Sequence, residues 1–259
     1  MTKREHISYS ELKDWAFCPH YHQKSWVEKV SPFEGNEYTA FGSAVHDVCE
    51  KKLLKEQIDE AEVFQIGFNK RLQKLLEKNI EVNNKNVEQM RQAGPEILAE
   101  VDKALEDYFG EYEVFSSEEM LYVPIEDFNV YFKGFVDAVI KVGDTYHLFD
   151  WKTCSWGWHS RKKSEKLVTY QLTLYKHFFC QKHKIDPAKV ETHFALLKRT
   201  ASKDRVELFR VTSGAKKTEN ALKLLYQAIY NILQGRTIKN RLNCLKPYRC
   251  RLYKTEHCS

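Results

Sequence analysis

The chain has 259 residues, of which 42% are hydrophobic and 30% are charged. A chain of this length can bury a hydrophobic core without disulfides, and its composition is too apolar for a disordered protein. Its 41 basic and 36 acidic residues give a net charge of +5, which does not by itself demand a polyanionic partner. Seven cysteines, an odd number, and a polar opening segment favour a reducing, cytoplasmic compartment over secretion. No apolar run reaches the length of a membrane span, so we expect no membrane protein.

Helical patterns dominate the first part of the chain. Ser10 is expected to cap a first helix, which Cys18-Pro19 interrupts. Apolar residues at helical spacing predict three more helices, and Gly94-Pro95 should weaken the third of them; the three cover residues 41–55, 63–79 and 87–108.

Strand patterns begin after these helices. Three β-rich segments are expected over residues 121–124, 130–142 and 145–151, and Gly143-Asp144 should form the turn between the last two. A helix (165–183), two strands (190–198 and 205–211) and a last helix (213–234) follow. This order predicts an α/β (α+β) fold in which helices flank a central mixed β-sheet. We expect one domain over residues 1–259, with a helical insertion at about 56–110 and a C-terminal tail at about 236–259.

Two of the predicted neighbouring strands carry acids in apolar surroundings. The two-residue period of a strand places Asp150 and Lys152 on one face, while Asp137 interrupts an apolar run in the preceding strand. A buried carboxylate is costly unless a cation or hydrogen bonds compensate it. Taken singly, each acid is more simply explained as a strand-end ion pair or a water-facing side chain. Taken together, they favour a divalent cation held by oxygen ligands.

These strands resemble the motif pair of the PD-(D/E)XK nucleases. The matching residues are Gly134-Phe135-Val136-Asp137 and Asp150-Trp151-Lys152-Thr153. More narrowly, the chain is similar to the RecB-like branch, which includes single-domain exonucleases of phages and CRISPR systems. Gly42 to His46 resembles that branch's helical histidine motif, Gln171 to Tyr175 its later helix, and Ser8 to Pro19 its opening helix. The resemblance covers residues 8–258 and implies a restriction-endonuclease-like core.

The resemblance also implies a set of site residues. The metal, Mg²⁺ or Mn²⁺, would be held by His46, Asp137, Asp150 and the backbone carbonyl of Trp151. Lys152 would orient the attacking water, and Gln171 and Tyr175 would position the lysine and the DNA backbone, so that the catalytic set comprises Lys152, Asp150, Asp137, Gln171 and Tyr175. Gly42 would let DNA or backbone approach closely. Glu50, one turn after His46, is either an additional metal-site residue or an exposed helix partner.

Aromatic and basic residues alternate directly after the lysine strand. Bases stack on aromatic rings and phosphates pair with cations, so this loop suits single-stranded DNA; its residues are Trp156, Trp158, Arg161, Lys162 and Lys163. Equally, the tryptophans could pack beneath the loop and the cations could be solvated. The tail has the same ambiguity, because one acid, Glu256, faces seven cations: Arg236, Lys239, Arg241, Lys246, Arg249, Arg251 and Lys254.

Four cysteines resemble the ligands of a [4Fe–4S] cluster found in some RecB-like nucleases. They are Cys18, Cys244, Cys250 and Cys258. The spacing Cys244-x5-Cys250-x7-Cys258 departs from the usual pattern, because Tyr253 stands where the middle cysteine would fall. Free, buried or zinc-bound thiols therefore remain the alternative. The remaining three, Cys49, Cys154 and Cys180, are expected to be buried thiols.

We therefore expect a metal-dependent DNA nuclease, an exonuclease on single-stranded ends that serves recombination, repair or phage DNA processing in a bacterial or phage-infected cell. The alternative is a non-catalytic DNA-binding or scaffold subunit of a recombination or CRISPR-adaptation complex. No Gly-x4-Gly-Lys-Ser/Thr loop is present, so unwinding would need a helicase or recombination partner. The helical insertion could form an arch through which a strand is threaded.

Overall fold

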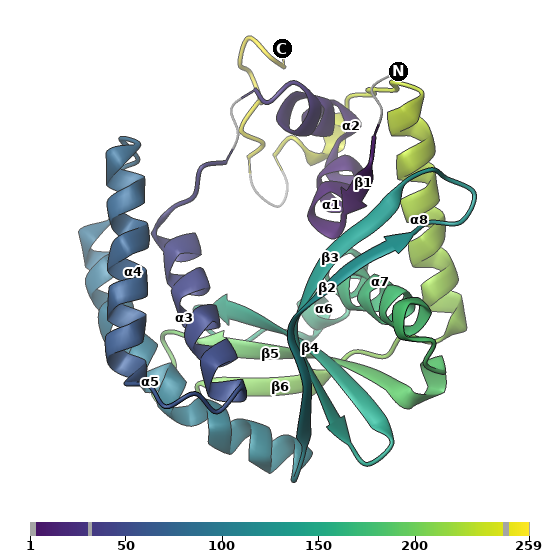
Figure 1. Cartoon of the computed structure of the whole chain (residues 1–259). Coiled ribbons are helices and arrows are strands. Elements are labelled where there is room, and N and C mark those ends of the chain that lie inside the picture. The colour runs from purple at the N-terminus through teal and green to yellow at the C-terminus, as the bar shows by residue number, and fades with distance from the viewer. Residues whose placement is uncertain (1–3, 31–32, 246–248, 259) are drawn as a thin grey trace. The chain divides into compact units, whose positions relative to one another are not determined.

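The computed structural model describes residues 4–30, 33–245 and 249–258 (Figure 1). The chain divides into two compact units, and β2 (Glu113–Pro124) and β3 (Tyr131–Val142) each contribute residues to both. The first unit consists of Met1–Phe33, Leu121–Gly134 and Gly214–Ser259, and the second of Glu34–Met120 and Phe135–Ser213.

The first unit is built around short N-terminal elements. Strand β1 (His6–Ser8) pairs in parallel with the start of β3, and α1 (Tyr9–Phe17) follows it directly. The Ser8 side chain caps α1 by accepting from the Glu11 N–H at 3.2 Å, so the prediction of Ser10 as the cap was wrong by two residues. The unit's other helical elements are α2 (Pro19–His22), a π-helical turn (Gln23–Val27), α8 (Ala215–Leu233) and a short 3₁₀ turn (Arg241–Asn243).

The second unit opens with three helices close to the predicted ranges. They are α3 (Glu37–Leu53), α4 (Glu60–Glu77) and α5 (Asn84–Phe109), and Figure 1 shows α3 and α4 side by side. Helix α5 continues through Pro95, where a weakening was predicted. Pro95 has no N–H to donate to the carbonyl of Arg91, and the Gln65 side chain donates to that carbonyl instead at 2.9 Å. The hydrogen bond from α4 thus compensates the proline in α5.

A mixed sheet forms the rest of the second unit. Within it β3, β4 (Thr145–Cys154), β5 (Val190–Lys198) and β6 (Val206–Arg210) lie in that order, with β4 and β5 parallel and the other two pairs antiparallel. Gly143, with φ +56°, makes the predicted turn between β3 and β4. Two helices, α6 (Ser160–Lys163) and α7 (Lys166–His183), and a 3₁₀ turn (Pro187–Lys189) connect β4 to β5. Helices around a mixed sheet confirm the predicted α/β fold class.

The two faces of β4 and β5 have different partners. Phe149, Trp151, Ala195 and Leu197 are buried in one cluster with apolar residues of α3, α4 and α5. The alternate side chains point the other way, where α7 packs on both strands. Among the described residues, no helix is long and apolar enough to span a membrane.

Candidate active site

The candidate site lies where β3 and β4 separate. Their paired residues run from Val142 and Thr145 at the turn to Ala138 and Phe149. Just beyond that last pair, the Asp137 side chain takes over the role of a strand partner, because its Oδ2 accepts the backbone N–H of Trp151 at 2.7 Å. The Asp137 side chain is only 15% exposed. This hydrogen bond therefore fixes a nearly buried carboxylate beside the end of β4.

Asp150 is the second carboxylate at this point, and both of its oxygens are engaged. It is 2% exposed. Its Oδ1 accepts from Nε2 of Gln171 on α7 at 2.7 Å, and its Oδ2 pairs with the ammonium of Lys152. Gln171 also donates to the hydroxyl of Tyr175 at 3.4 Å. The glutamine and the lysine thus hold Asp150 from α7 and from its own strand.

Helix α3 brings an imidazole to the two acids. His46 Nδ1 lies 3.7 Å from Asp137 Oδ2, and the ring is hydrogen-bonded to the backbone of Trp151. Burial lowers the pKa of His46 to about 4, so the ring is neutral at neutral pH and has a lone pair available. Gly42, one turn earlier, faces Thr153 of β4, whose Oγ1 would lie 3.1 Å from an added Cβ. The close approach at Gly42 is therefore between helix and strand.

Burial and neighbouring charges shift the pKa values of several residues at the site. Burial raises the pKa of Asp137, and the like charge of Asp150 raises it further. Burial alone would lower the pKa of Lys152, but Asp150 and Asp137 outweigh it, so the net direction is upward. Lys152 is therefore a firmly held ammonium between two carboxylates. Burial raises the pKa of Tyr175 above its ordinary value, and the charge of Asp150 adds to this rise, so Tyr175 stays a neutral phenol.

Glu118 is an acid near this site that the sequence analysis did not single out. Burial raises its pKa, and the charges of Glu50, Asp47 and Asp150 raise it further. Its φ of +49° interrupts the extended backbone of β2. The strand was predicted to begin only at Leu121, which left Glu118 in an expected loop; the positive φ of a glutamate leaves no sequence signal. Glu50 is partly buried and belongs to the same electrostatic neighbourhood.

In the loop after β4, some of the predicted DNA-binding residues pack against the protein and others are exposed. Trp158 packs on Phe194, with ring centroids 5.2 Å apart, and Lys162 Nζ lies 4.5 Å from the Trp158 ring centre. Lys163 forms an ion pair with Glu207. Trp156, in contrast, is 72% exposed, and Arg161 is also exposed. The exposed pair is thus available to a ligand, while Trp158, Lys162 and Lys163 contact the protein. Among the tail's cations, Lys246 lies outside the described residues.

One cavity of about 210 Å³ in the first unit is lined by all four cysteines that were predicted as possible cluster ligands. Cys18 joins α1 to α2, and the other three, Cys244, Cys250 and Cys258, come from the C-terminal segment. Burial raises the pKa of the Cys250 thiol, and its three cysteine neighbours add to the rise. None of the four forms a disulfide. The unusual spacing therefore does not keep the thiols apart.

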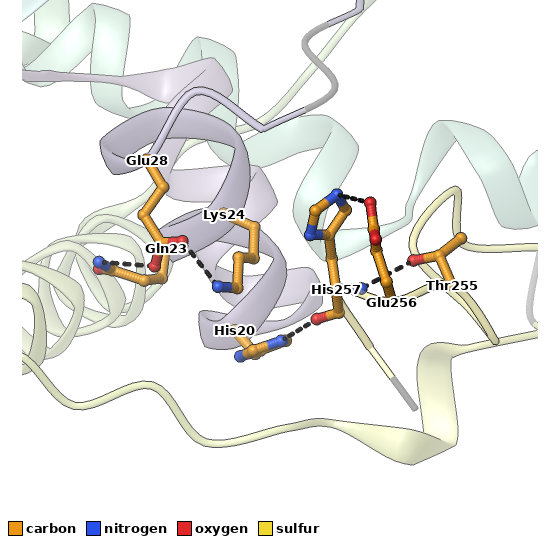
Figure 2. Close-up of polar contacts among 7 residues, drawn as sticks. All are labelled: His20, Gln23, Lys24, Glu28, Thr255, Glu256 and His257. Carbon is orange, nitrogen blue, oxygen red and sulfur yellow. Dashed lines mark hydrogen bonds and ion pairs between the residues drawn. The ribbon is translucent and has the colours of Figure 1, made fainter.

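Hydrogen bonds fasten the C-terminal segment around this cavity. His20 Nε2 donates to the carbonyl of His257 at 2.9 Å, directly before Cys258 (Figure 2). The backbone N–H of Asn240 donates to Cys18 Sγ at 3.3 Å, and its side chain donates to the Phe17 carbonyl at 3.1 Å. These contacts hold residues more than 200 positions apart in sequence around the thiols. Of the remaining cysteines, Cys49 and Cys180 are buried as predicted and Cys154 is partly exposed.

A further set of side chains that could hold a metal ion lies elsewhere in the second unit. His147, Glu191 and His193 place one ligand atom each within 4.8 Å of the other two. None of the three was predicted as a site residue. They come from β4 and β5, and only the pairing of these strands brings them together.

Comparison with known proteins agrees with these features. The family model of the PD-(D/E)XK nuclease superfamily matches residues 6–255. The chain belongs to this superfamily. It is therefore a hydrolytic nuclease with DNA as its substrate, from a superfamily that usually uses divalent metals. The comparison with curated proteins gives no match.

Two examples of solved structures that are similar to the chain are the following. One is a "Putative exonuclease" from Eubacterium rectale, 15% identical, with a TM-score of 0.58 over 96% of this chain and 86% of that one. The other is a protein named SSO0001, 13% identical, with a TM-score of 0.39 over 92% of this chain and 80% of that one. The first supports the fold.

Because the Asp137 carboxylate is buried beside a like charge, we predict that removing its charge increases the free energy of unfolding. Its raised pKa means that Asp137 stabilises the fold below its unfolded pKa of about 4 and loses this contribution as pH rises through the folded value. Asp137→Asn keeps an acceptor for the Trp151 N–H and removes the charge. In EDTA we expect the variant to be about 0.5–2 kcal/mol more stable than wild type at pH 8, with a smaller gain at pH 5.

Urea unfolding at both pH values measures this difference. The matched control is Asp144→Asn in the β3–β4 turn, where the side chain is 88% exposed and should change stability little. A variant that is less stable than wild type at pH 8 would contradict the prediction.

Proposed function

We propose that the chain is an Mg²⁺- or Mn²⁺-dependent deoxyribonuclease that degrades single-stranded DNA from free ends. The observation that carries the proposal is the meeting of His46, Asp137, Asp150 and Lys152 at the separation of β3 and β4. We further propose that residues 1–259 act as one nuclease domain and belong to the RecB-like branch, since one family model matches segments of both compact units.

The donor set fits a small hard cation. Two carboxylates lie side by side with burial and mutual repulsion raising the pKa of one of them, and a cation would relieve that repulsion. The neutral ring of His46 and the carbonyl of Trp151 complete the residues that would hold it. When bound, such an ion polarises the scissile phosphate and lowers the pKa of a coordinated water.

The chain's own residues would supply orientation and charge. Lys152 is held by Asp150 with its side chain 32% exposed, so its ammonium can reach both the attacking water and the charge that grows on the phosphate. Gln171 keeps Asp150 in place, and Tyr175 in turn supports Gln171. The Trp151 N–H keeps Asp137 in place. Each acid is thus preorganised by a separate hydrogen bond.

Preference for single strands is supported by the loop after β4. Trp156 offers an exposed ring on which an unpaired base can stack, and Arg161 can pair with a phosphate. In a duplex the bases are already stacked on each other, so this contact would be lost. A helicase or recombination partner would then supply the single strand.

Lys152→Arg tests the role assigned to the lysine. Arginine keeps the positive charge beside Asp150, so the fold should be retained, but it cannot take part in proton transfer and its planar group directs its donors differently. We expect cleavage of end-labelled single-stranded DNA to fall by at least about 100-fold with either metal, at an unchanged melting temperature.

The matched control for this variant is Lys198→Arg, another strand lysine, which pairs with Glu207 at 3.4 Å. It should cleave like wild type. Undiminished cleavage by Lys152→Arg would remove Lys152 from the mechanism. A wild-type protein that binds DNA but cleaves none with Mg²⁺ or Mn²⁺ would favour the non-catalytic scaffold.

Dependence on free ends predicts a difference between linear and circular substrates. Linear single-stranded DNA should be degraded at least about tenfold faster than a circle of the same sequence, because a circle offers no end. Duplex DNA should also be cut more slowly. Gel analysis of labelled substrates over a Mg²⁺ and Mn²⁺ series, with Lys152→Ala beside it, measures both ratios; equal rates on circle and linear strand would reject the exonuclease.

We also propose that the four-cysteine cavity binds a [4Fe–4S] cluster. Four thiols around one cavity match the ligand number of such a cluster, and the Asn240 N–H at Cys18 Sγ is the kind of contact that tunes cluster sulfurs. Burial and the neighbouring cysteines raise the pKa of Cys250, so a cation beside this thiol would favour its ionised form. Bound iron would supply that charge.

Anaerobic purification should therefore give brown protein with about four iron atoms and four sulfides per chain. Cys250→Ser should lose most of the iron, whereas Cys180→Ser, a buried thiol of the second unit, should keep it. A colourless, iron-free wild-type protein would exclude the cluster. One zinc ion bound by the same thiols would instead support the zinc-bound alternative.

A further inference from the structure

His147, Glu191 and His193 form a second, nitrogen-rich group of ligand atoms in the same sheet. His147 lies on β4 and the other two lie on β5, where the parallel register pairs His147 with Glu191. The strand period places His147 on the face of Phe149 and Trp151, opposite Asp150 and Lys152. Its ring packs on Phe109 of α5, with centroids 5.1 Å apart. The group is therefore separate from the nuclease site.

The distances among the three side chains suit ligands of one ion. His147 Nδ1 and His193 Nε2 are 3.0 Å apart, and Glu191 Oε2 lies 3.8 Å from the first and 3.9 Å from the second. Around a tetrahedral ion with bonds of about 2.0–2.1 Å, neighbouring ligand atoms are about 3.3 Å apart. Small side-chain adjustments reach that geometry. Glu191 Oε2 lies too far from both ring nitrogens to be hydrogen-bonded to either of them.

Neighbouring residues contact the other polar atoms of two of these side chains, His193 and Glu191. The Tyr108 hydroxyl lies 3.3 Å from Nδ1 of His193, which leaves Nε2 for the ion. Arg210 binds the other oxygen of Glu191, Oε1, at 2.8 Å, which leaves Oε2. The His193 side chain is only 3% exposed.

We propose that His147, Glu191 and His193 bind one Zn²⁺ ion through His147 Nδ1, His193 Nε2 and Glu191 Oε2. The donor set decides the metal. Two imidazoles favour Zn²⁺ over Mg²⁺, which prefers oxygen ligands. The single carboxylate is already balanced by Arg210, so the site has little net negative charge to attract a hard cation.

The role that follows is structural. The ion would cross-link β4 to β5 where Tyr108 and Phe109 of α5 contact His193, and Phe109 also contacts His147. It would thereby hold the end of the α5 helix on the sheet. Asp137, Asp150 and Lys152 lie on the opposite face of the strands, so zinc occupancy and cleavage should be separable.

Zinc binding by the full-length protein tests the proposal. After equilibrium dialysis against Zn²⁺ in excess Mg²⁺, we expect one zinc per chain with an X-ray absorption shell of nitrogen and oxygen only. This shell distinguishes it from zinc at the cysteines, which would show sulfur. Glu191→Gln can still accept from Arg210 but loses the anionic ligand, and should weaken zinc binding by at least about tenfold. Tyr108→Phe should weaken it less.

Matched controls make each outcome decisive. Asp144→Asn removes an exposed acid from the nearby turn and should bind zinc like wild type, and Asp150→Asn should do so while losing cleavage. Zinc should raise the melting temperature of wild type and not that of Glu191→Gln. Wild type without nitrogen- and oxygen-bound zinc, or Glu191→Gln and His193→Gln both binding it undiminished, would overturn the proposal.

Discussion

The hydrogen bond from the Trp151 N–H to the Asp137 carboxylate is the interaction around which the site is organised. Strands β3 and β4 stop pairing one step earlier, and without this contact a backbone donor would be left without its partner at the separation. The same bond holds Asp137 beside Asp150 although the two charges repel. Because Gln171 and Lys152 hold Asp150 independently, neither acid can turn away to relieve the repulsion. Strand geometry and these side-chain contacts thus hold the two acids together, as the proposed cation site requires.

Helix α3 depends on the same strand in a different way. Gly42 allows it to pack close to Thr153, and one turn later this places His46 against the Trp151 backbone and Asp137. A side chain at position 42 would require the Thr153 side chain or the helix to yield by a few tenths of an ångström. Burial then keeps that imidazole neutral, so packing decides both where the ring lies and which protonation state it has.

Sequence patterns located those parts of the fold that local periodicity controls. The alternation around Asp150 and the single acid in the run near Asp137 predicted both strands, and the helical ranges were close. What depends on tertiary contacts could not be predicted. Gln65 donates to the carbonyl that Pro95 leaves unpaired, so α5 continues through the weakening that was expected at Gly94-Pro95. Glu118 lies at a positive φ that glutamate does not signal, and His147 meets His193 only because β4 and β5 pair in one register.

Strand β4 also explains how metals of different chemistry could be kept apart within the second unit. Its alternation turns His147 toward α5 and Asp150 toward α7, three positions later. On the Asp150 side, carboxylates outnumber cations and oxygen dominates, which suits Mg²⁺ or Mn²⁺. On the His147 side, nitrogen dominates and Arg210 cancels the one carboxylate, which suits Zn²⁺. The two proposed sites thus differ in donor chemistry, and the strand period alone places their β4 residues on opposite faces.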